Sequence, residues 1–208
     1  MLAFPQSTTV HRKIPKEAFY KHMNLSGALK EKFVAQVDRI FVENSLTQKN
    51  LNLGEASPIK EILLLVMTLK KQEFDGKIAE AIARQNPHKL VFLLQFEGKG
   101  QLAIYHGRLY RTVWVNEEAL KLNLEGTSLD GIWEHMIEQI ALKEERPGKT
   151  ETLTMDERLA RQAELERLTA LIEKTERAVW KEKQPKKKFA LYQKLQEYKK
   201  KLEETAHG

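Results

Sequence analysis

The 208-residue sequence predicts an α+β protein: a small mixed β-sheet with N-terminal helices, followed by a C-terminal antiparallel helical hairpin that forms a coiled coil. Two observations predict this fold. Short apolar runs, punctuated by glycine and proline, alternate with helical patterns up to residue 140. Beyond residue 155, apolar residues recur every three or four positions within a highly charged stretch. We therefore expect an α+β core domain at 1–143, a linker at 144–154 and a basic coiled-coil hairpin at 155–204.

The first 58 residues are predicted to be extended at the start and helical afterwards. Residues 1–15 contain two prolines and three hydroxyl side chains, which favours an extended arm with an edge strand at 8–11. Pro15 suits the first turn of a short helix at 16–23. Apolar residues spaced three and four apart predict a second helix from Asn24 or Ser26 to about Ser45, and a loop follows to Pro58.

The middle of the chain predicts the order β-α-β-β-β-α. Residues 59–69 are dense in branched apolar side chains, as in a strand buried on both faces. Asp75 can cap a helix at 76–85, and a strand at 88–96 follows, so the two strands should be parallel. Glycines at 97–100 predict a hairpin turn into strands at 101–106 and 109–115. Ser128 begins a helix whose sheet-facing residues are Ile132, Trp133, Met136, Ile137 and Ile140.

Two apolar stripes near the C-terminus indicate a hairpin and not one long helix. The second stripe does not continue the seven-residue phase of the first, and Pro185 interrupts the helix between them. Folding the chain back near residues 183–185 places Leu165 opposite Leu202 and Ile172 opposite Leu195. The stripes consist of Leu165, Leu168, Ile172, Thr175 and Val179, and of Leu191, Leu195, Tyr198 and Leu202.

Composition bounds the class of protein. Lys and Arg number 35 against 29 acids, and the net charge of +6 suggests an anionic partner. The absence of cysteine excludes disulfides, thiolate metal sites and a cysteine nucleophile. The longest apolar run, 62–67, is far too short to cross a membrane, and the N-terminal charges follow the apolar residues, the reverse of a secretory signal. We expect a cytoplasmic protein that does not bind a membrane.

Positive charge gathers around the predicted turn of the hairpin. Residues 173–188 hold seven basic and three acidic residues, a net charge of +4. Trp180 and Phe189 lie beside these lysines, so phosphate contacts and base stacking are both available. The alternative is a solvated coiled-coil end in which the two aromatic residues pack the hairpin closed. The candidate nucleic-acid-binding residues are Lys174, Arg177, Trp180, Lys181, Lys183, Lys186, Lys187 and Lys188.

Two catalytic alternatives receive weak support. A magnesium-dependent nuclease requires converging acids and a lysine, and Glu61, Glu97 and Lys99 are the best residues for it, with Glu73 and Asp75 as supplements. His88 and His106 could approach each other in an antiparallel pair but lack a third ligand. Neither G-x-x-x-x-G-K-[ST] nor G-x-G-x-x-G occurs. We therefore predict no catalytic residue, no cofactor and no metal.

A protein–protein adaptor is the third function class. A two-helix arm presents faces outside its own seam, which could dock another protein or a second copy of this chain. The residues expected on those faces are Leu159, Ala163, Leu171 and Ala178.

Several stretches together resemble a bacterial family, domain-of-unknown-function family 4391. At the N-terminus the resemblance rests on Pro5, Ser7, Thr8, Val10, residues 12–16, Phe19 and Tyr20. It continues in residues 25–42, in the strand N-P-H-K-L-V-F-L-L, in the helix around Trp133 and in the segment 181–188. It implies no assigned reaction. It implies proximity to helicase and DNA-methyltransferase genes of restriction-like defence clusters. Relatives often carry acidic residues in the strand at 62–69, where this sequence has none, which weakens a catalytic interpretation.

The sequence thus predicts a non-enzymatic accessory protein of a bacterial defence or restriction-like system. We expect its basic arm to bind nucleic acid without strong sequence preference, to dock a nucleic-acid enzyme such as a helicase or methyltransferase, or to do both. A divergent magnesium-dependent nuclease and a pure adaptor are the alternatives, and a homodimer stays open.

Overall fold

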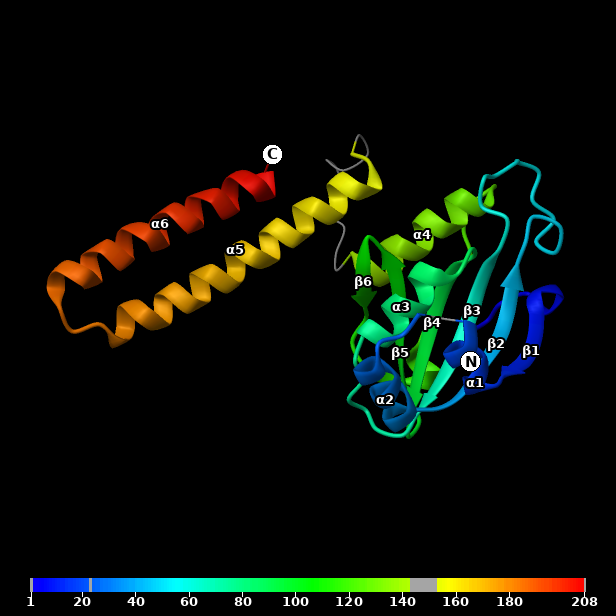
Figure 1. The fold of residues 1–208 in the computed structure, drawn as a ribbon. Helices are drawn as coiled ribbons and strands as arrows, with labels where there is room; N and C mark the ends of the chain where they lie inside the picture. The colour runs from blue at the N-terminus through cyan, green and yellow to red at the C-terminus, as the bar shows by residue number, and fades with distance from the viewer. Residues whose placement is uncertain (1, 23, 143–152, 208) are drawn as a thin grey trace. The chain divides into compact units, whose positions relative to one another are not determined.

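The computed structural model describes residues 2–22, 24–142 and 153–207 (Figure 1). The chain divides into two compact units, Met1–Lys143 and Glu144–Gly208. The first is an α+β unit built on one sheet, and the second contains two long helices. Both parts of the predicted fold class are confirmed.

One mixed sheet organises the first unit. Its strands are ordered β1-β2-β3-β4-β5-β6, with the short β7 also paired to β5. The pair β3–β4 is parallel, as its short β-α-β connection predicted, and all other pairs are antiparallel. The strands are β1 (Thr9–Ile14), β2 (Val37–Leu46), β3 (Ile62–Leu69), β4 (Lys89–Phe96), β5 (Lys99–His106), β6 (Arg108–Arg111) and β7 (Val115–Asn116).

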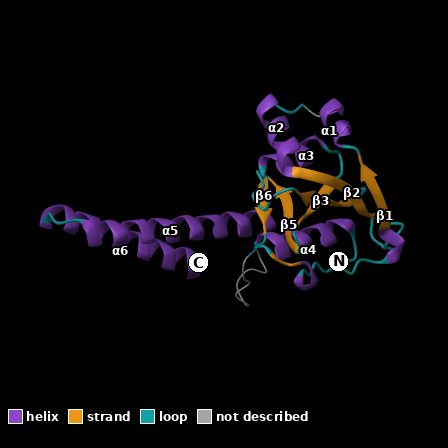
Figure 2. Cartoon of the chain, turned by 90° about the horizontal axis from the view of Figure 1, so that it is seen from below, coloured by secondary structure: helices purple, strands orange, loops and turns teal. Residues whose placement is uncertain are grey.

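Helices cover both faces of this sheet. Figure 2 shows α1 (Lys16–His22), α2 (Gly27–Gln36) and α3 (Lys77–Gln85) on one face and α4 (Leu129–Ala141) on the other. Successive residues of β3 are buried, as are those of β4, because side chains alternate between the two covered faces. Ser26 and Ser128 accept backbone N–H groups at the starts of α2 and α4, as predicted. Short 3₁₀ turns occur at Gln6–Thr8 and Glu117–Ala119.

The predicted helix from residue 24–26 to Ser45 is wrong in its second half. Helix α2 ends at Gln36, and residues 37–46 form β2. A β-bulge between Val37 and Arg39 leaves Val37 and Ile40 both buried, so the three-residue spacing that suggests a helix arises from an irregular strand. The β-branched residues of this segment favour the strand.

The hairpin predicted at 97–100 is present with a shorter turn, Glu97 and Gly98, because β5 begins at Lys99, and the predicted strand at 109–115 is divided. Glu97 and Gly98 adopt φ values of 45° and 75°, the left-handed pair that a two-residue turn between antiparallel strands uses. After β6, the Thr112 hydroxyl accepts the Leu102 N–H at 3.0 Å, so a side chain replaces the backbone partner there. This replacement interrupts the ladder between β6 and β7.

The second unit is a helical hairpin of α5 (Met155–Lys181) and α6 (Pro185–His207). The two helices pack against each other, as predicted. Thr154 and Glu157 form a capping box at the start of α5. Pro185 opens α6, as expected where a proline cannot continue a helix. The most buried members of the predicted stripes are Leu168, Ile172, Thr175 and Leu195. Of the predicted linker, residues 144–152 lie outside the described residues.

No helix in the described ranges combines the length and the apolarity that crossing a membrane requires.

Asp75 joins two helices of the core unit, and its stability contribution should depend on pH. Its carboxylate accepts the Lys32 ammonium at 2.8 Å and the Lys77 N–H at 3.0 Å, and these bonds lower the pKa of Asp75 below its ordinary value of 3.8. A lowered pKa stabilises the fold above pH 3.8, and this contribution is lost as the pH falls through the lowered value. Asp75→Asn should therefore reduce Tm at pH 7, with a difference from the unsubstituted protein that shrinks in acid. Glu55→Gln, on an exposed loop, serves as the control; a pH-independent difference for Asp75→Asn would contradict this account.

Arg161 closes the open end of the hairpin. Its Nε and Nη2 donate to the carbonyls of Thr205 and Ala206, each at 2.9 Å, which satisfies acceptors that the end of α6 would otherwise leave unpaired. Arg161→Ala should destabilise the last turns of α6 by about 1.5 kcal/mol, the lower end of the range for hydrogen bonds to charged groups, because the site is partly exposed. Hydrogen exchange should therefore accelerate at residues 200–206 and stay unchanged near Pro185. Equal protection in both proteins would show that these bonds contribute nothing.

Candidate nucleic-acid interface

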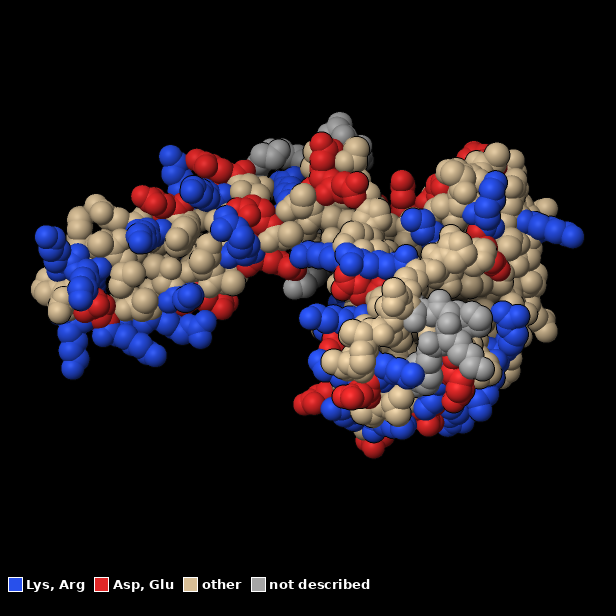
Figure 3. Space-filling view, viewed as in Figure 1, with Lys and Arg blue, Asp and Glu red and all other residues tan. Residues whose placement is uncertain are grey.

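The turn between α5 and α6 presents every predicted nucleic-acid-binding residue to solvent. We call residues 173–192 the tip. The last turns of α5, the connection at 182–184 and the first turn of α6 supply its basic side chains, and all of them are exposed. Figure 3 shows Lys and Arg side chains gathered over the end of the arm where the two helices join.

The acids of the tip are engaged within the arm. Glu176 forms an ion pair with Lys199 at 2.9 Å, and Glu182 accepts the Gln184 N–H at 2.8 Å. Glu173 lies 4.0 Å from Arg177, at the limit of an ion pair. The negative charges therefore hold the hairpin together and leave most of the positive charge unneutralised.

The lysines of the tip have no such partners. None forms an ion pair or a side-chain hydrogen bond with any residue that the structure describes. The ammonium groups can therefore meet an external anion without first breaking an internal contact. The residues are Lys174, Lys181, Lys183, Lys186, Lys187 and Lys188.

Three of these lysines occupy a position that disfavours them. The first turn of a helix carries the positive end of the helix dipole, so acidic residues stabilise it and cations destabilise it. Helix α5 follows this rule, with Asp156 and Glu157 in its first turn. Helix α6 has no acid there and begins Pro-Lys-Lys-Lys. Folding therefore gives no reason for the lysines at 186–188.

The aromatic residues of the tip do not close the hairpin. Trp180 is 86% exposed and Phe189 is 63% exposed. The alternative interpretation, in which both rings pack between the helices, is therefore wrong for this structure. Tyr192, 51% exposed, is a third ring of the tip, which the sequence reasoning missed. Its position next to Leu191, on the outer side of the stripe, was the signal that could have revealed it.

The candidate nuclease residues do not converge. Glu61 precedes β3 and Glu97 follows β4, and because these strands are parallel the two acids lie at opposite ends of the pair. Eight residues of strand separate these ends by about 26 Å. Glu61 accepts a hydrogen bond from the Ser45 hydroxyl and lies 3.2 Å from His88 Nδ1. The supplementary residues Glu73 and Asp75 pair with Lys71 and Lys32.

The two candidate histidines have different positions: His88 lies before β4, 3.2 Å from Glu61, and His106 is the last residue of β5. Val91 pairs with Ile104, so the same register places His106 opposite Lys89, the residue after His88. Within the described ranges, no three His, Cys, Asp or Glu side chains gather as a metal ion would require.

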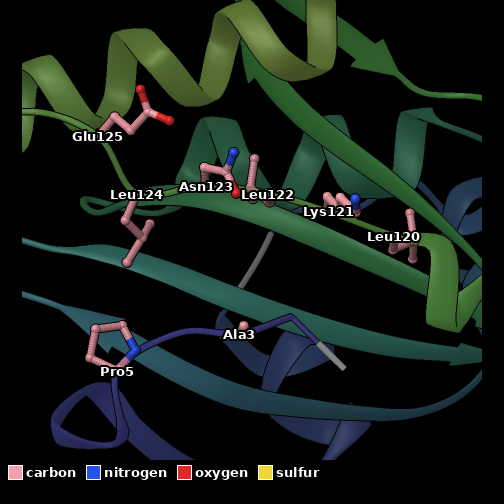
Figure 4. A pocket seen from close by; sticks show the side chains of 8 residues that line it. All are labelled: Ala3, Pro5, Leu120, Lys121, Leu122, Asn123, Leu124 and Glu125. Atoms are coloured by element: carbon pink, nitrogen blue, oxygen red, sulfur yellow. The ribbon is translucent and has the colours of Figure 1, made fainter.

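A shallow hollow in the core unit lacks the chemistry of an active site. It encloses about 410 Å³ between the N-terminal segment, at Ala3 and Pro5, and the extended residues 120–125. Figure 4 shows Leu124 directed toward the N-terminal segment and the Glu125 carboxylate directed away from it. No pair of facing titratable side chains lines this hollow.

The adaptor interpretation loses one of its residues. Leu159 is 4% exposed, so it cannot be part of a free docking face, whereas Ala163, Leu171 and Ala178 are partly exposed.

These features define a class of protein: an α+β unit joined to a coiled-coil hairpin with a basic, aromatic tip. The family described as "Domain of unknown function (DUF4391)" matches residues 2–202, and the chain belongs to this family, as its resemblance indicated. A comparison with curated proteins found no match, and neither did a comparison with solved structures.

The dipole argument makes a prediction about stability. Replacing Lys186, Lys187 and Lys188 with Glu should raise the melting temperature of the hairpin by a few degrees, because acids suit the first turn of α6. Circular dichroism of the full chain and hydrogen exchange in α6 would measure this change. Lys199→Glu is the matched control, since it removes the ion pair with Glu176 and should destabilise the hairpin. A loss of stability in the triple variant would show that the three lysines support the fold.

Proposed function

We propose that this protein is a non-enzymatic accessory protein that binds nucleic acid through the tip of its helical hairpin. Its contacts are directed to the phosphate backbone. The lysines of the tip supply the binding charge, and the core unit serves as a scaffold.

The observation that supports this proposal most directly is the group of unpaired lysines at the turn of the hairpin. Six lysines of the tip have no partner among the described residues, while its acids are engaged within the arm. The positive charges of such a cluster repel one another. Binding to the phosphates of a nucleic acid relieves this repulsion and releases the counterions of the nucleic acid, and both effects favour binding. Three of its members also stand where the helix dipole opposes them, which is expected for residues retained to bind an anion.

Lysine determines the kind of recognition. An ammonium group is a flexible point charge without the fixed planar fork that lets arginine read guanine. A lysine-rich tip therefore binds phosphate oxygens and carries little sequence information. Binding should be weakly sequence-dependent and strongly salt-dependent.

The family resemblance provides a setting for this activity. It implies gene neighbours that encode helicases and DNA methyltransferases of restriction-like defence clusters. An accessory protein that holds nucleic acid suits such enzymes, and the hairpin could dock one of them as well. We therefore place the protein in a bacterial defence or restriction-like system in the cytoplasm.

Salt-dependent binding tests this proposal. Replacing Lys183, Lys186, Lys187 and Lys188 with Gln should weaken binding to duplex DNA and flatten its salt dependence. Each lost phosphate contact lowers the slope of log K against log salt by about 0.9. Fluorescence anisotropy of labelled DNA, titrated with the full chain at several salt concentrations, measures both quantities.

A matched control separates position from total charge. Replacing Lys49, Lys194, Lys200 and Lys201 with Gln removes the same charge outside the tip and keeps the ion pair between Lys199 and Glu176. This variant should retain most of the slope. Equal losses in the two variants would indicate a diffuse attraction and not a site. If the unsubstituted protein bound neither DNA nor RNA at low salt, the proposed function would be wrong and the arm would be a protein-docking element.

A further inference from the structure

We propose that the tip selects unpaired nucleic-acid strands over duplexes, because its exposed aromatic rings are placed to stack on bases. This inference rests on the proposed function and specifies its ligand class. The lysines account for attraction to any polyanion, whereas the rings require a ligand that offers flat faces.

The distribution of exposed rings is the first observation. Large hydrophobic side chains with high exposure are few among the described residues, and three of them, Val10, Val34 and Val113, belong to the core unit. The other three are aromatic and all lie in the tip: Trp180, Phe189 and Tyr192. Aromatic side chains usually bury most of their large surface, so three exposed rings within thirteen positions indicate a binding surface.

These three rings are not part of the seam between the helices. Leu168, Ile172 and Leu195 fill the seam, and Val179 and Leu191 approach its tip end half-buried. Trp180 and Tyr192 each follow one of these residues by one position, which turns them away from the seam. Phe189 and Tyr192 are three residues apart and therefore share the outer face of α6.

Cations accompany the rings at helical spacing. Residues three or four apart on a helix are neighbours on its surface, so a ring and a cation at that spacing meet the same ligand. No cation lies over the faces of these rings among the described residues, and each ring exposes more than half of its surface. Each ring has a cation one turn before it: Arg177 before Trp180, Lys186 before Phe189 and Lys188 before Tyr192.

The alternation of basic and aromatic side chains in the tip suits a single-stranded nucleic acid. A single strand presents phosphates and unstacked bases along the same backbone, and proteins bind it with a basic surface interleaved with aromatic platforms. A duplex offers the same phosphates but hides the faces of its bases between neighbouring pairs. An interfacial membrane helix would place its apolar residues on one continuous face, and the apolar stripes of these helices already form the seam. The observations therefore favour unpaired DNA or RNA.

Binding of two ligands by the full chain tests the inference. The ligands are a labelled oligodeoxythymidylate, which forms no duplex, and a mixed-sequence duplex with the same number of phosphates. The unsubstituted protein should prefer the oligodeoxythymidylate at physiological salt. Binding should also quench the fluorescence of Trp180, since stacking covers its ring.

Variants of the rings distinguish stacking from general apolar contact. Replacing Trp180, Phe189 and Tyr192 with Leu keeps apolar, helix-forming side chains but removes the aromatic faces. Affinity for the oligodeoxythymidylate should fall at least tenfold, since each stacked ring contributes about that factor. Duplex affinity and the salt slope should stay the same, because the lysines remain. The matched control, Trp180→Phe with Tyr192→Phe, should retain the preference, and circular dichroism confirms that each hairpin is folded.

Each other outcome has a defined meaning. If the leucine variant bound the oligodeoxythymidylate like the unsubstituted protein, stacking would be refuted while lysine-dependent duplex binding preserved the proposed function. Loss of binding to every nucleic acid in the unsubstituted protein would refute both proposals. Ring-dependent binding to phosphatidylserine vesicles, without preference for the single strand, would assign the tip to a membrane surface and overturn the inference.

Discussion

The narrow apolar seam between α5 and α6 is the constraint on which the arm depends. Neither helix carries enough apolar surface to be stable alone in water, so each exists because it buries the other's stripe. The seam uses one residue every three or four and leaves most of the charged positions of both helices exposed or partly exposed. Leu168, Ile172 and Leu195 fix the helices in register, and Arg161 closes the end opposite the turn. This division leaves the outer positions of the tip free to serve a ligand.

Charge is sorted along the hairpin according to what folding requires. Outside the tip, several acids and bases compensate each other: Arg167 pairs with Glu164, and Lys200 pairs with Glu204. At the start of α5 the capping box with Glu157 agrees with the helix dipole. At the start of α6 this agreement ends. Because local electrostatics and helix stability point the same way elsewhere in the arm, their conflict at residues 186–188 is a signal of function.

The sequence predicts an element correctly where the spacing of its apolar residues fits only one kind of secondary structure. It fails where a strand and a helix give the same spacing. The phase break between Val179 and Leu191 predicts two helices, and the β-α-β spacing predicts that β3 and β4 are parallel. The bulge near Val37 reproduces a helical spacing within a strand, so a window of apolar residues cannot distinguish the two. For the candidate site, composition identifies the lysines. The exposure of Trp180 depends on the packed seam, which a list of residues does not contain.

The length of α5 explains why the binding surface can differ so much from the core unit. Its 27 residues rise about 40 Å, so the tip lies far from the first turn of its own helix. In the core unit, Asp75 pairs with Lys32, and Glu61 accepts a hydrogen bond from the Ser45 hydroxyl. The candidate nuclease acids Glu61 and Glu97 lie at opposite ends of their strand pair, so the described residues support the proposed binding at the tip better than a nuclease site on the sheet.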